Sequence, residues 1–201
     1  MYFRTRPGAE TPDATISVLP FLYEMVGRER RIHRTKRGIT MNINVLRSES
    51  IGSIHVRSGN PADPPAIRFN FLSAQADRDG LLAAMRKARE LMSTSPLKEI
   101  TGEEIAPGAH LQTDDELLDW VRNTAETTYH PVGTCKMGSD PMAVVDSELR
   151  VHGIEGLRVA DASIMPTLTS GNTNAPSIMI GEKCAATVLA AATSRERKAA
   201  A

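Results

Sequence analysis

Alternation of apolar and polar residues in the segment ITMNINVLR, residues 39–47, restricts the fold of this chain more than any other feature. The apolar positions are Ile39, Met41, Ile43 and Val45, and the polar positions between them are Thr40, Asn42 and Asn44. Successive side chains of a β-strand point to opposite faces, so this pattern is typical of a strand with one apolar face. It recurs in SIHVR at 53–57 and AIRFNFL at 66–72, after turn-rich gaps. We therefore predict an antiparallel sheet whose polar face is either solvated or the roof of a substrate cavity.

Two helices are predicted after the strands. In residues 77–96 an apolar stripe recurs at helical spacing, and Pro96 closes the segment. The stripe consists of Leu81, Met85, Ala88 and Met92. Its methionines favour a place in the core over a cofactor-binding role. In residues 113–125, Thr113 and Glu116 have the spacing of a capping box, which predicts a short helix.

A third helix is predicted over 175–192, in the segment APSIMIGEKCAATVLAAA. Asn174 is its expected N-cap, and Pro176 lies in its first turn. The helix is mostly apolar and is therefore expected to be buried. The Ala-rich charged tail that follows, 194–201, is expected to be a frayed, disordered end.

Charge and cysteine content exclude several classes of protein. The 201 residues contain 24 basic and 24 acidic side chains, so no excess of one sign draws the chain to nucleic acid or to a membrane surface. Its two cysteines, Cys135 and Cys184, lack the close spacing of zinc sites and disulfide frameworks, and no metal site is predicted. No apolar run is long enough to span a bilayer. A cytoplasmic protein without a membrane span is the expectation.

Two polar clusters are candidates for chemistry. In TTYHPVGTCKMGSD, residues 127–140, His130 precedes a proline, which favours extended backbone and a fixed ring direction. In SGNTNAP, residues 170–176, Asn172 and Asn174 lie at the start of a helix, where unpaired N–H groups favour negative charge. A hydrogen-bonded structural histidine and a capping asparagine explain the same residues, and the residues alone favour this structural interpretation over a functional site. The remaining histidines are interpreted as structural or solvent-facing: His33, His55, His110 and His152.

Other patterns in the first cluster do not predict a site. GTCKMGSD lacks the lysine that a phosphate-binding loop places after its second glycine. Cys135 is interpreted as a small buried thiol, because no base is fixed beside it by the sequence. Lys136 has no partner that the sequence assigns.

Three blocks of the sequence closely resemble the C-terminal signature of the glucose–methanol–choline (GMC) family of FAD-dependent alcohol oxidoreductases. They are YHPVGTCKMG, VVDSELRVHGIEGLRVADASIMPT and SGNTNAPSIMIGEKCA, which together span about 129–185. The earlier segment at 46–73 is similar to the substrate-domain sheet of the same family. GNTNAP carries asparagine where the sugar and aryl-alcohol oxidases carry a second histidine, which indicates choline-dehydrogenase-like members.

The resemblance implies a catalytic pair and a substrate. His130 corresponds to the family's catalytic histidine, and Asn172 corresponds to the residue that shares the substrate oxygen with it. A small alcohol must lose its hydroxyl proton as hydride leaves its carbon for the flavin, and a neutral imidazole is a suitable base. Choline, another primary alcohol and an aromatic alcohol all remain open as substrates.

The resemblance also implies an FAD site. It places Asp161 and Ala162 near the ribityl and phosphate region, and the backbone of Thr173 and Asn174 near the flavin pyrimidine. There the N-terminus of the last helix would stabilise the negative charge of the reduced flavin.

The family's dinucleotide-binding motif is absent, because no two glycines of this chain are separated by a single residue. We expect an α+β chain made of a partial substrate domain, 1–128, and a signature segment, 129–193, that normally completes the FAD-binding domain. A separate or missing N-terminal half would hold FAD, and without it the last helix should leave apolar surface uncovered. The chain is then half of a split enzyme, an inactive truncated product, or a non-enzymatic ligand-binding or interaction module.

Overall fold

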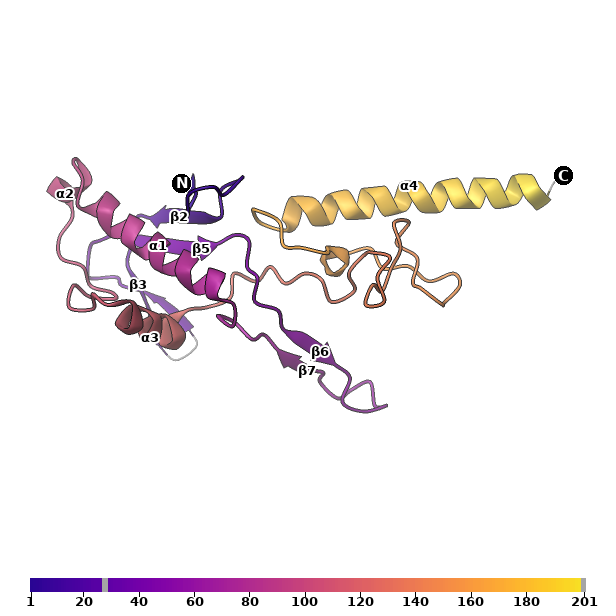
Figure 1. Ribbon diagram of the computed structural model, residues 1–201, viewed down its shortest axis with the longest axis horizontal. Coiled ribbons are helices and arrows are strands. Elements are labelled where there is room, and N and C mark those ends of the chain that lie inside the picture. Colours follow the sequence, from indigo (N-terminus) through magenta and orange to yellow (C-terminus); the bar gives the residue numbers. More distant parts are fainter. Residues whose placement is uncertain (27–28, 200–201) are drawn as a thin grey trace. The chain divides into compact units, whose positions relative to one another are not determined.

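The computed structural model describes residues 1–26 and 29–199, drawn as a ribbon in Figure 1. The chain folds into two compact units. Unit 1 consists of Met1–Gly52 and Phe69–Thr128, and unit 2 consists of Ser53–Arg68 and Tyr129–Ala201. Small antiparallel sheets together with helices confirm the predicted α+β class.

The sheet of unit 1 has three antiparallel strands, β1 (Tyr2–Phe3), β2 (Ala14–Leu19) and β5 (Thr40–Val45), in the order β1-β2-β5. The strand predicted from the alternating segment is confirmed as β5. Its polar positions are not simply solvated, however, because all of β5 is half-buried. One cause is Tyr23, whose hydroxyl donates a hydrogen bond of 2.7 Å to the Asn42 side chain.

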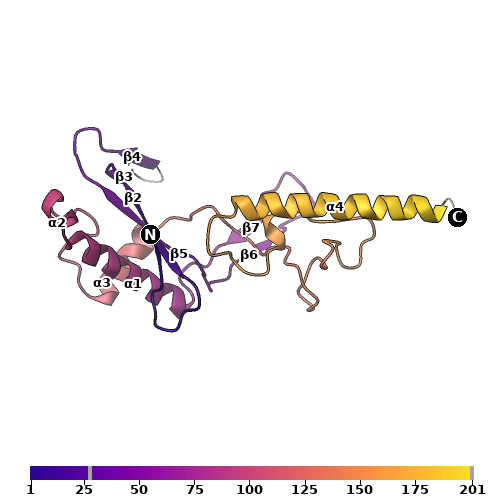
Figure 2. The same cartoon turned by 90° about the horizontal axis from the view of Figure 1, so that it is seen from above.

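A hairpin of β3 (Tyr23–Val26) and β4 (Glu29–Ile32) also belongs to unit 1 and is labelled in Figure 2. Tyr23 pairs with Ile32 and Val26 with Glu29. This hairpin was not predicted, because the charged run that contains β4 has no alternation of apolar and polar residues. Residues 27 and 28 lie outside the described part of the chain.

Helices α1 (Gln75–Met92), α2 (Leu97–Ile100) and α3 (Asp114–Thr124) complete unit 1. Helix α1 packs against β2 and β5. At Gly80 the approach is so close that an added Cβ would lie 3.3 Å from Val45 Cγ2. A larger residue at position 80 would require the side chain of Val45 to shift.

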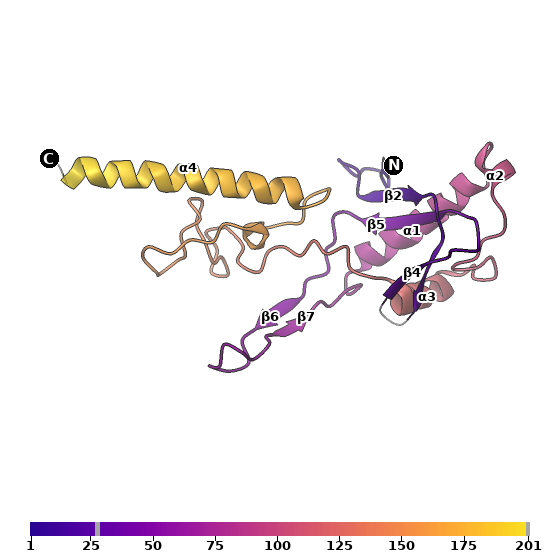
Figure 3. The ribbon, with the colours of Figure 1, turned by 180° about the vertical axis from the view of Figure 1, so that it is seen from behind.

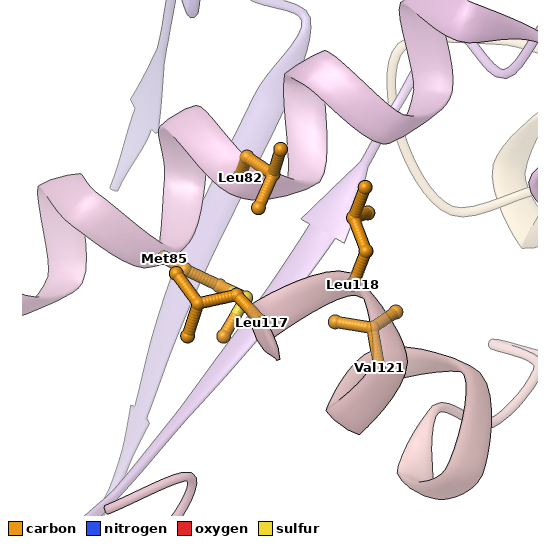
Figure 4. Packing of buried hydrophobic residues seen from close by; sticks show 5 residues of the cluster. All are labelled: Leu82, Met85, Leu117, Leu118 and Val121. Atoms are coloured by element: carbon orange, nitrogen blue, oxygen red, sulfur yellow. The ribbon is translucent and has the colours of Figure 1, made fainter. Parts of the chain in front are cut away.

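The core of unit 1 lies between α1 and α3, as Figure 4 shows. Its buried members are Leu82, Met85, Leu117, Leu118 and Val121. The prediction that the methionine-containing stripe belongs to the core is confirmed at Met85, which is 6% exposed. The predicted capping box of α3 is confirmed as well, since Thr113 and Glu116 bond each other's backbone.

Unit 2 contains a hairpin, β6 (Ser53–His55) and β7 (Ala66–Arg68), visible in Figure 3. These strands were predicted at 53–57 and 66–72, and they pair with each other. Within the described part of the chain they form a two-stranded sheet of their own, so the predicted single sheet is divided. The remaining elements of unit 2 are the 3-10 helix η1 (Ala162–Ile164) and helix α4 (Asn174–Ala199).

Irregular segments supply most of the core of unit 2, whose buried members are Val145, Leu149, Ile164, Met165 and Ile180. Helix α4 is not buried as predicted, because Ile178 is 61% and Leu189 67% exposed. It also continues through 194–199, part of the expected disordered tail, while residues 200 and 201 lie outside the described residues. Among the described helices, none combines the length and the apolar character needed to cross a bilayer.

Candidate active site

His130 follows a residue with unusual backbone. Tyr129 has φ 60°, in the left-handed region that bulky residues rarely occupy. Such a conformation costs on the order of 1–3 kcal/mol and persists only where surrounding structure holds it. Tyr129 is 73% exposed, whereas His130 is half-buried. The chain thus turns at Tyr129 and directs the next side chain inward.

Backbone hydrogen bonds tie the loop after His130 to the segment around η1. The amide of Cys135 donates to the carbonyl of Ser163 at 3.0 Å, and the amide of Met137 donates to the carbonyl of Ile164 at 2.8 Å. The Cys135 thiol itself is half-buried and free. These bonds give the loop a defined path in the absence of a helix or strand.

The start of α4 lies beside His130. Thr173, which immediately precedes the helix, is 8% exposed, and its carbonyl accepts hydrogen bonds from the amide (2.9 Å) and the hydroxyl (2.7 Å) of Ser177. Thr173 therefore occupies the N-cap position that we predicted for Asn174. Asn174 is the first residue of the helix and is exposed.

The contact that joins the two polar clusters is between His130 and Thr173. Thr173 Oγ1 lies 3.0 Å from His130 Nδ1, a hydrogen-bonding distance. Only the backbone of Thr173 was predicted to belong to the site. A signal for its side chain was present, because a threonine before a helix whose third residue is a proline has lost one of its usual partners.

Asn172 is adjacent to this contact, and its side chain is exposed. Among the described residues, no hydrogen bond joins Asn172 to His130 or to any other group. The structure thus brings His130 and Thr173 together, and the side-chain amide of Asn172 has no hydrogen-bond partner among the described residues. Its role as a partner of His130 stays a prediction.

Asp161 caps η1, because its Oδ1 accepts a hydrogen bond of 2.8 Å from the amide of Ser163. Its side chain is exposed, and no other hydrogen bond to its carboxylate occurs in the described part of the chain. Ala162 packs partly against the core of unit 2. The structure thus gives Asp161 and Ala162 local structural roles, and their contact with a cofactor stays a prediction.

Two carboxylates of unit 2 have lowered pKa values. Asp140 accepts a hydrogen bond from Lys136 Nζ at 2.9 Å, which lowers the pKa of Asp140, and a bond from the amide of Met142 adds to the effect. Lys136, for which the sequence assigned no partner, thus has one. Burial opposes ionisation of Asp146, but hydrogen bonds from the backbone and side chain of Arg150 lower the pKa of that carboxyl overall. Both carboxylates order the loops of unit 2.

The other histidines have no hydrogen bond to His130 or Thr173 among the described residues. His152 Nε2 is 3.1 Å from the carbonyl of Gly138, which supports the structural interpretation of that ring. His55 and His110 are exposed and His33 is half-buried. Over residues 1–26 and 29–199, no group of three histidine, cysteine or acidic side chains could hold a metal ion.

The family model of the GMC oxidoreductases matches residues 48–181, about two thirds of the chain. This chain belongs to the GMC oxidoreductase family. It is 43% identical, over 190 residues, to the oxygen-dependent choline dehydrogenase of Brucella melitensis, and the match covers 94% of this chain and 34% of that relative. The chain thus spans about a third of the length of this curated relative, and the choline-dehydrogenase-like resemblance is confirmed.

Solved structures support the same assignment. Pyridoxine 4-oxidase from Mesorbium loti has a TM-score of 0.81 and 27% identity, with 92% of this chain and 36% of that chain covered. An FAD-dependent oxidoreductase from Chaetomium thermophilum has a TM-score of 0.73 and 28% identity, with 89% of this chain and 28% of that chain covered. The fold of this chain is therefore that of the C-terminal part of GMC oxidoreductases.

Proposed function

We propose that this chain is the C-terminal, substrate-binding part of an FAD-dependent enzyme that oxidises an alcohol at its CH–OH carbon. The observation that carries the proposal is the half-buried imidazole of His130, which is hydrogen-bonded through Nδ1 to Thr173. Thr173 directly precedes helix α4, whose first residue is exposed. One ring nitrogen is held by the protein, which leaves Nε2 for a substrate. Choline, named in the curated relatives, is the first alcohol to test.

The residues at the start of α4 fit the pyrimidine end of a flavin. The first turn of a 26-residue helix presents backbone N–H groups without partners inside the helix. Exposed amide groups of Asn172 and Asn174 lie beside them. These donors suit carbonyl oxygens and a ring nitrogen that becomes negative, and the positive end of the helix dipole favours the same charge.

Asp161 and Ala162 are proposed to face the ribityl and phosphate region. Only Oδ1 of Asp161 has a hydrogen bond among the described residues, so Oδ2 can accept one from a sugar-chain hydroxyl. Ala162 has no polar side chain and can contribute only its backbone.

FAD, when bound, supplies the acceptor for the hydride of the substrate. Nε2 of His130 accepts the hydroxyl proton, a positioned proton transfer typically worth about 10²- to 10⁴-fold in rate. The Asn172 amide donates a hydrogen bond to the same oxygen and thereby orients the alcohol. Because a neutral carboxamide is too weakly basic to take up a proton near neutral pH, Asn172 cannot replace His130 as the base.

Residues outside this chain, on the same polypeptide or a separate one, are proposed to supply the FAD-binding half. The match to about a third of the length of the Brucella melitensis relative supports this partner. So does helix α4, whose large exposed apolar residues include Ile178, Met179, Val188 and Leu189. Apolar groups in such number on one helix favour a protein partner that covers them.

The test is to co-express this chain with the N-terminal two thirds of a curated choline dehydrogenase and to record the visible spectrum. We expect flavin absorbance that bleaches when choline or another alcohol is added without oxygen. His130→Gln should abolish bleaching and keep the flavin, while His55→Gln, a change at an exposed histidine of β6, should alter neither. A colourless product, or bleaching that survives His130→Gln, would contradict the proposal; the former would favour a non-enzymatic binding module.

A further inference from the structure

The side chain of Thr173 has an uncommon environment for a hydroxyl at the start of a helix. The residue is 8% exposed, so water has little access to it. Among the described residues its hydroxyl has a single hydrogen-bond partner, Nδ1 of His130 at 3.0 Å. An N-cap hydroxyl ordinarily accepts a bond from the amide of the second or third residue of its helix.

Pro176 explains why the hydroxyl is not used for capping. It is the third residue of α4, which begins at Asn174, and proline has no backbone N–H. One of the two donors that an N-cap threonine ordinarily binds is therefore missing. The Thr173 hydroxyl is bonded to the imidazole instead of to the remaining donor, the amide of Ala175.

Ser177 fixes the position of Thr173. Its amide and its hydroxyl both donate to the Thr173 carbonyl, at 2.9 Å and 2.7 Å. The backbone of Thr173 is thus anchored to the first full turn of α4. A side chain on an anchored backbone can hold the His130 ring more firmly than a loop side chain could.

The direction of the bond at Nδ1 decides which nitrogen of the ring is free. A hydroxyl can donate or accept, and a neutral imidazole carries its proton on one nitrogen only. If Thr173 donates to Nδ1, the proton lies on Nε2, and that nitrogen cannot accept another. If Nδ1–H donates to Thr173 Oγ1, Nε2 presents its lone pair.

We propose that Thr173 is a positioning residue that holds His130 in the tautomer with the proton on Nδ1, so that Nε2 is free to accept one. After Nε2 takes up a proton, both ring nitrogens are donors, and Oγ1 still accepts from Nδ1–H. An uncharged hydroxyl fixes the tautomer without the added negative charge that a carboxylate partner brings in Ser-His-Asp triads. The catalytic benefit rests on the proposed function, but the tautomer itself does not.

The tautomer is measurable in the flavin-free 201-residue chain. Long-range ¹H–¹⁵N spectra of the chain labelled with ring-¹⁵N histidine distinguish a protonated ring nitrogen from a bare one, and His130→Gln identifies the signal. The spectra are recorded at alkaline pH, and the tautomer is assigned from the signals of the neutral ring. We expect a protonated Nδ1 and a bare Nε2 in the wild type.

The decisive variants are Thr173→Val, which keeps the branched shape and removes the hydroxyl, and Thr173→Ser, which keeps the hydroxyl. Valine should shift the His130 population toward Nε2–H, and serine should retain the wild-type pattern. Thr187→Val, a threonine of α4 that bonds the carbonyl of Lys183, is the matched control and should change nothing. In the flavin-containing enzyme, valine should lower the bleaching rate about 10-fold or more, with serine close to wild type.

Three results would overturn the proposal. The first is a wild-type ring with its proton on Nε2, and the second is a Thr173→Val ring indistinguishable from the wild type. The third is loss of the folded amide spectrum in both Thr173→Val and Thr173→Ala, which would make the role of Thr173 structural. Alcohol-dependent bleaching that persists in His130→Gln would instead contradict the proposed function and leave the tautomer result intact.

Discussion

Units 1 and 2 form their cores in different ways. In unit 1 every member of the main buried cluster comes from helix α1 or helix α3. In unit 2 only Ile180 of the buried cluster comes from the long helix α4, and Ile164 comes from the short helix η1. Irregular segments joined by backbone hydrogen bonds supply the rest. Periodic patterns thus assemble unit 1, whereas particular backbone contacts assemble unit 2.

The candidate site lies in unit 2, the less regular of the two. Loops can place a residue such as His130 in a direction that no helix or strand offers, and catalytic residues are often found on them for this reason. The cost is that the geometry depends on individual contacts, such as those of Thr173 and Cys135. The two buried clusters share no residue, so each can be disturbed separately.

The largest effect is expected from Leu117→Ala, in the core of unit 1. Leu117 is 1% exposed, and truncation of a buried leucine costs about 2–5 kcal/mol. The single tryptophan, Trp120, packs against the same cluster, so its fluorescence during urea unfolding reports on unit 1. The ring signal of His130 should keep its wild-type position in native buffer. Leu189→Ala, at a position 67% exposed, is the control and should change stability by about 0.5 kcal/mol or less.

Val145→Ala is the counterpart in unit 2. Val145 is fully buried, and the loss of its methyl groups should cost about 2 kcal/mol. The His130 ring signal should disappear at a lower urea concentration, while the Trp120 transition stays in place. If the His130 signal and the Trp120 signal shifted equally along the urea axis, the two units would unfold together. Their cores would then not be independent.

Asp77→Asn should have a smaller effect that depends on pH. Asp77 is 4% exposed and accepts hydrogen bonds from Ser48, Glu49 and Ser50. Burial alone would raise the pKa of Asp77, yet these bonds together lower it from the ordinary 3.8. A lowered pKa in the folded state stabilises the fold above about pH 4 and loses this effect as the pH falls through the folded value. We expect Asn to cost about 1 kcal/mol at neutral pH, with the difference from the wild type shrinking below about pH 4 in Trp120-detected urea unfolding. A cost that does not vary with pH would contradict this account.

Lys136→Ala should have the smallest effect. Lys136 is partly exposed and Asp140 is exposed, and ion pairs at the surface contribute little to stability because water screens them. Stability should therefore change little, but the pKa of the Asp140 carboxyl should rise toward 3.8, since its largest stabilising hydrogen bond is removed. A ¹³C-detected titration of the carboxyl groups measures this rise. An unchanged titration would mean that the hydrogen bond from the amide of Met142 is enough to lower the pKa of Asp140.

Local patterns predicted much of unit 1. Strand β5 and helices α1 and α3 follow from alternation, helical spacing and a capping box, all of which act over a few residues. The β3–β4 hairpin was missed because its backbone pairing carries no comparable side-chain pattern. The pairing of the strands into separate sheets was missed for a related reason, since alternation identifies a strand without naming its neighbour.

The candidate site was predictable only in part. His130, Asn172 and Asp161 were identified through resemblance to a family, because no periodic pattern marks them. The contact of His130 with the Thr173 hydroxyl joins residues 43 positions apart through irregular chain, and no local rule predicts such a contact. Proline at the third helical position was the one local sign that this hydroxyl had been released for another partner.

The backbone bonds from Cys135 and Met137 to the η1 segment also have a consequence for exchange with solvent. Amide protons normally exchange rapidly in loops and slowly in helices and strands, because exchange requires a hydrogen bond to open. These two amides donate to Ser163 and Ile164 beside a buried core, although neither lies in a helix or a strand. In deuterated solvent they should retain their protons far longer than the exposed amides of the turn at 58–65. Slow exchange at Cys135 and Met137 would then identify the backbone hydrogen bonds that hold the candidate site, although both residues lie in a loop.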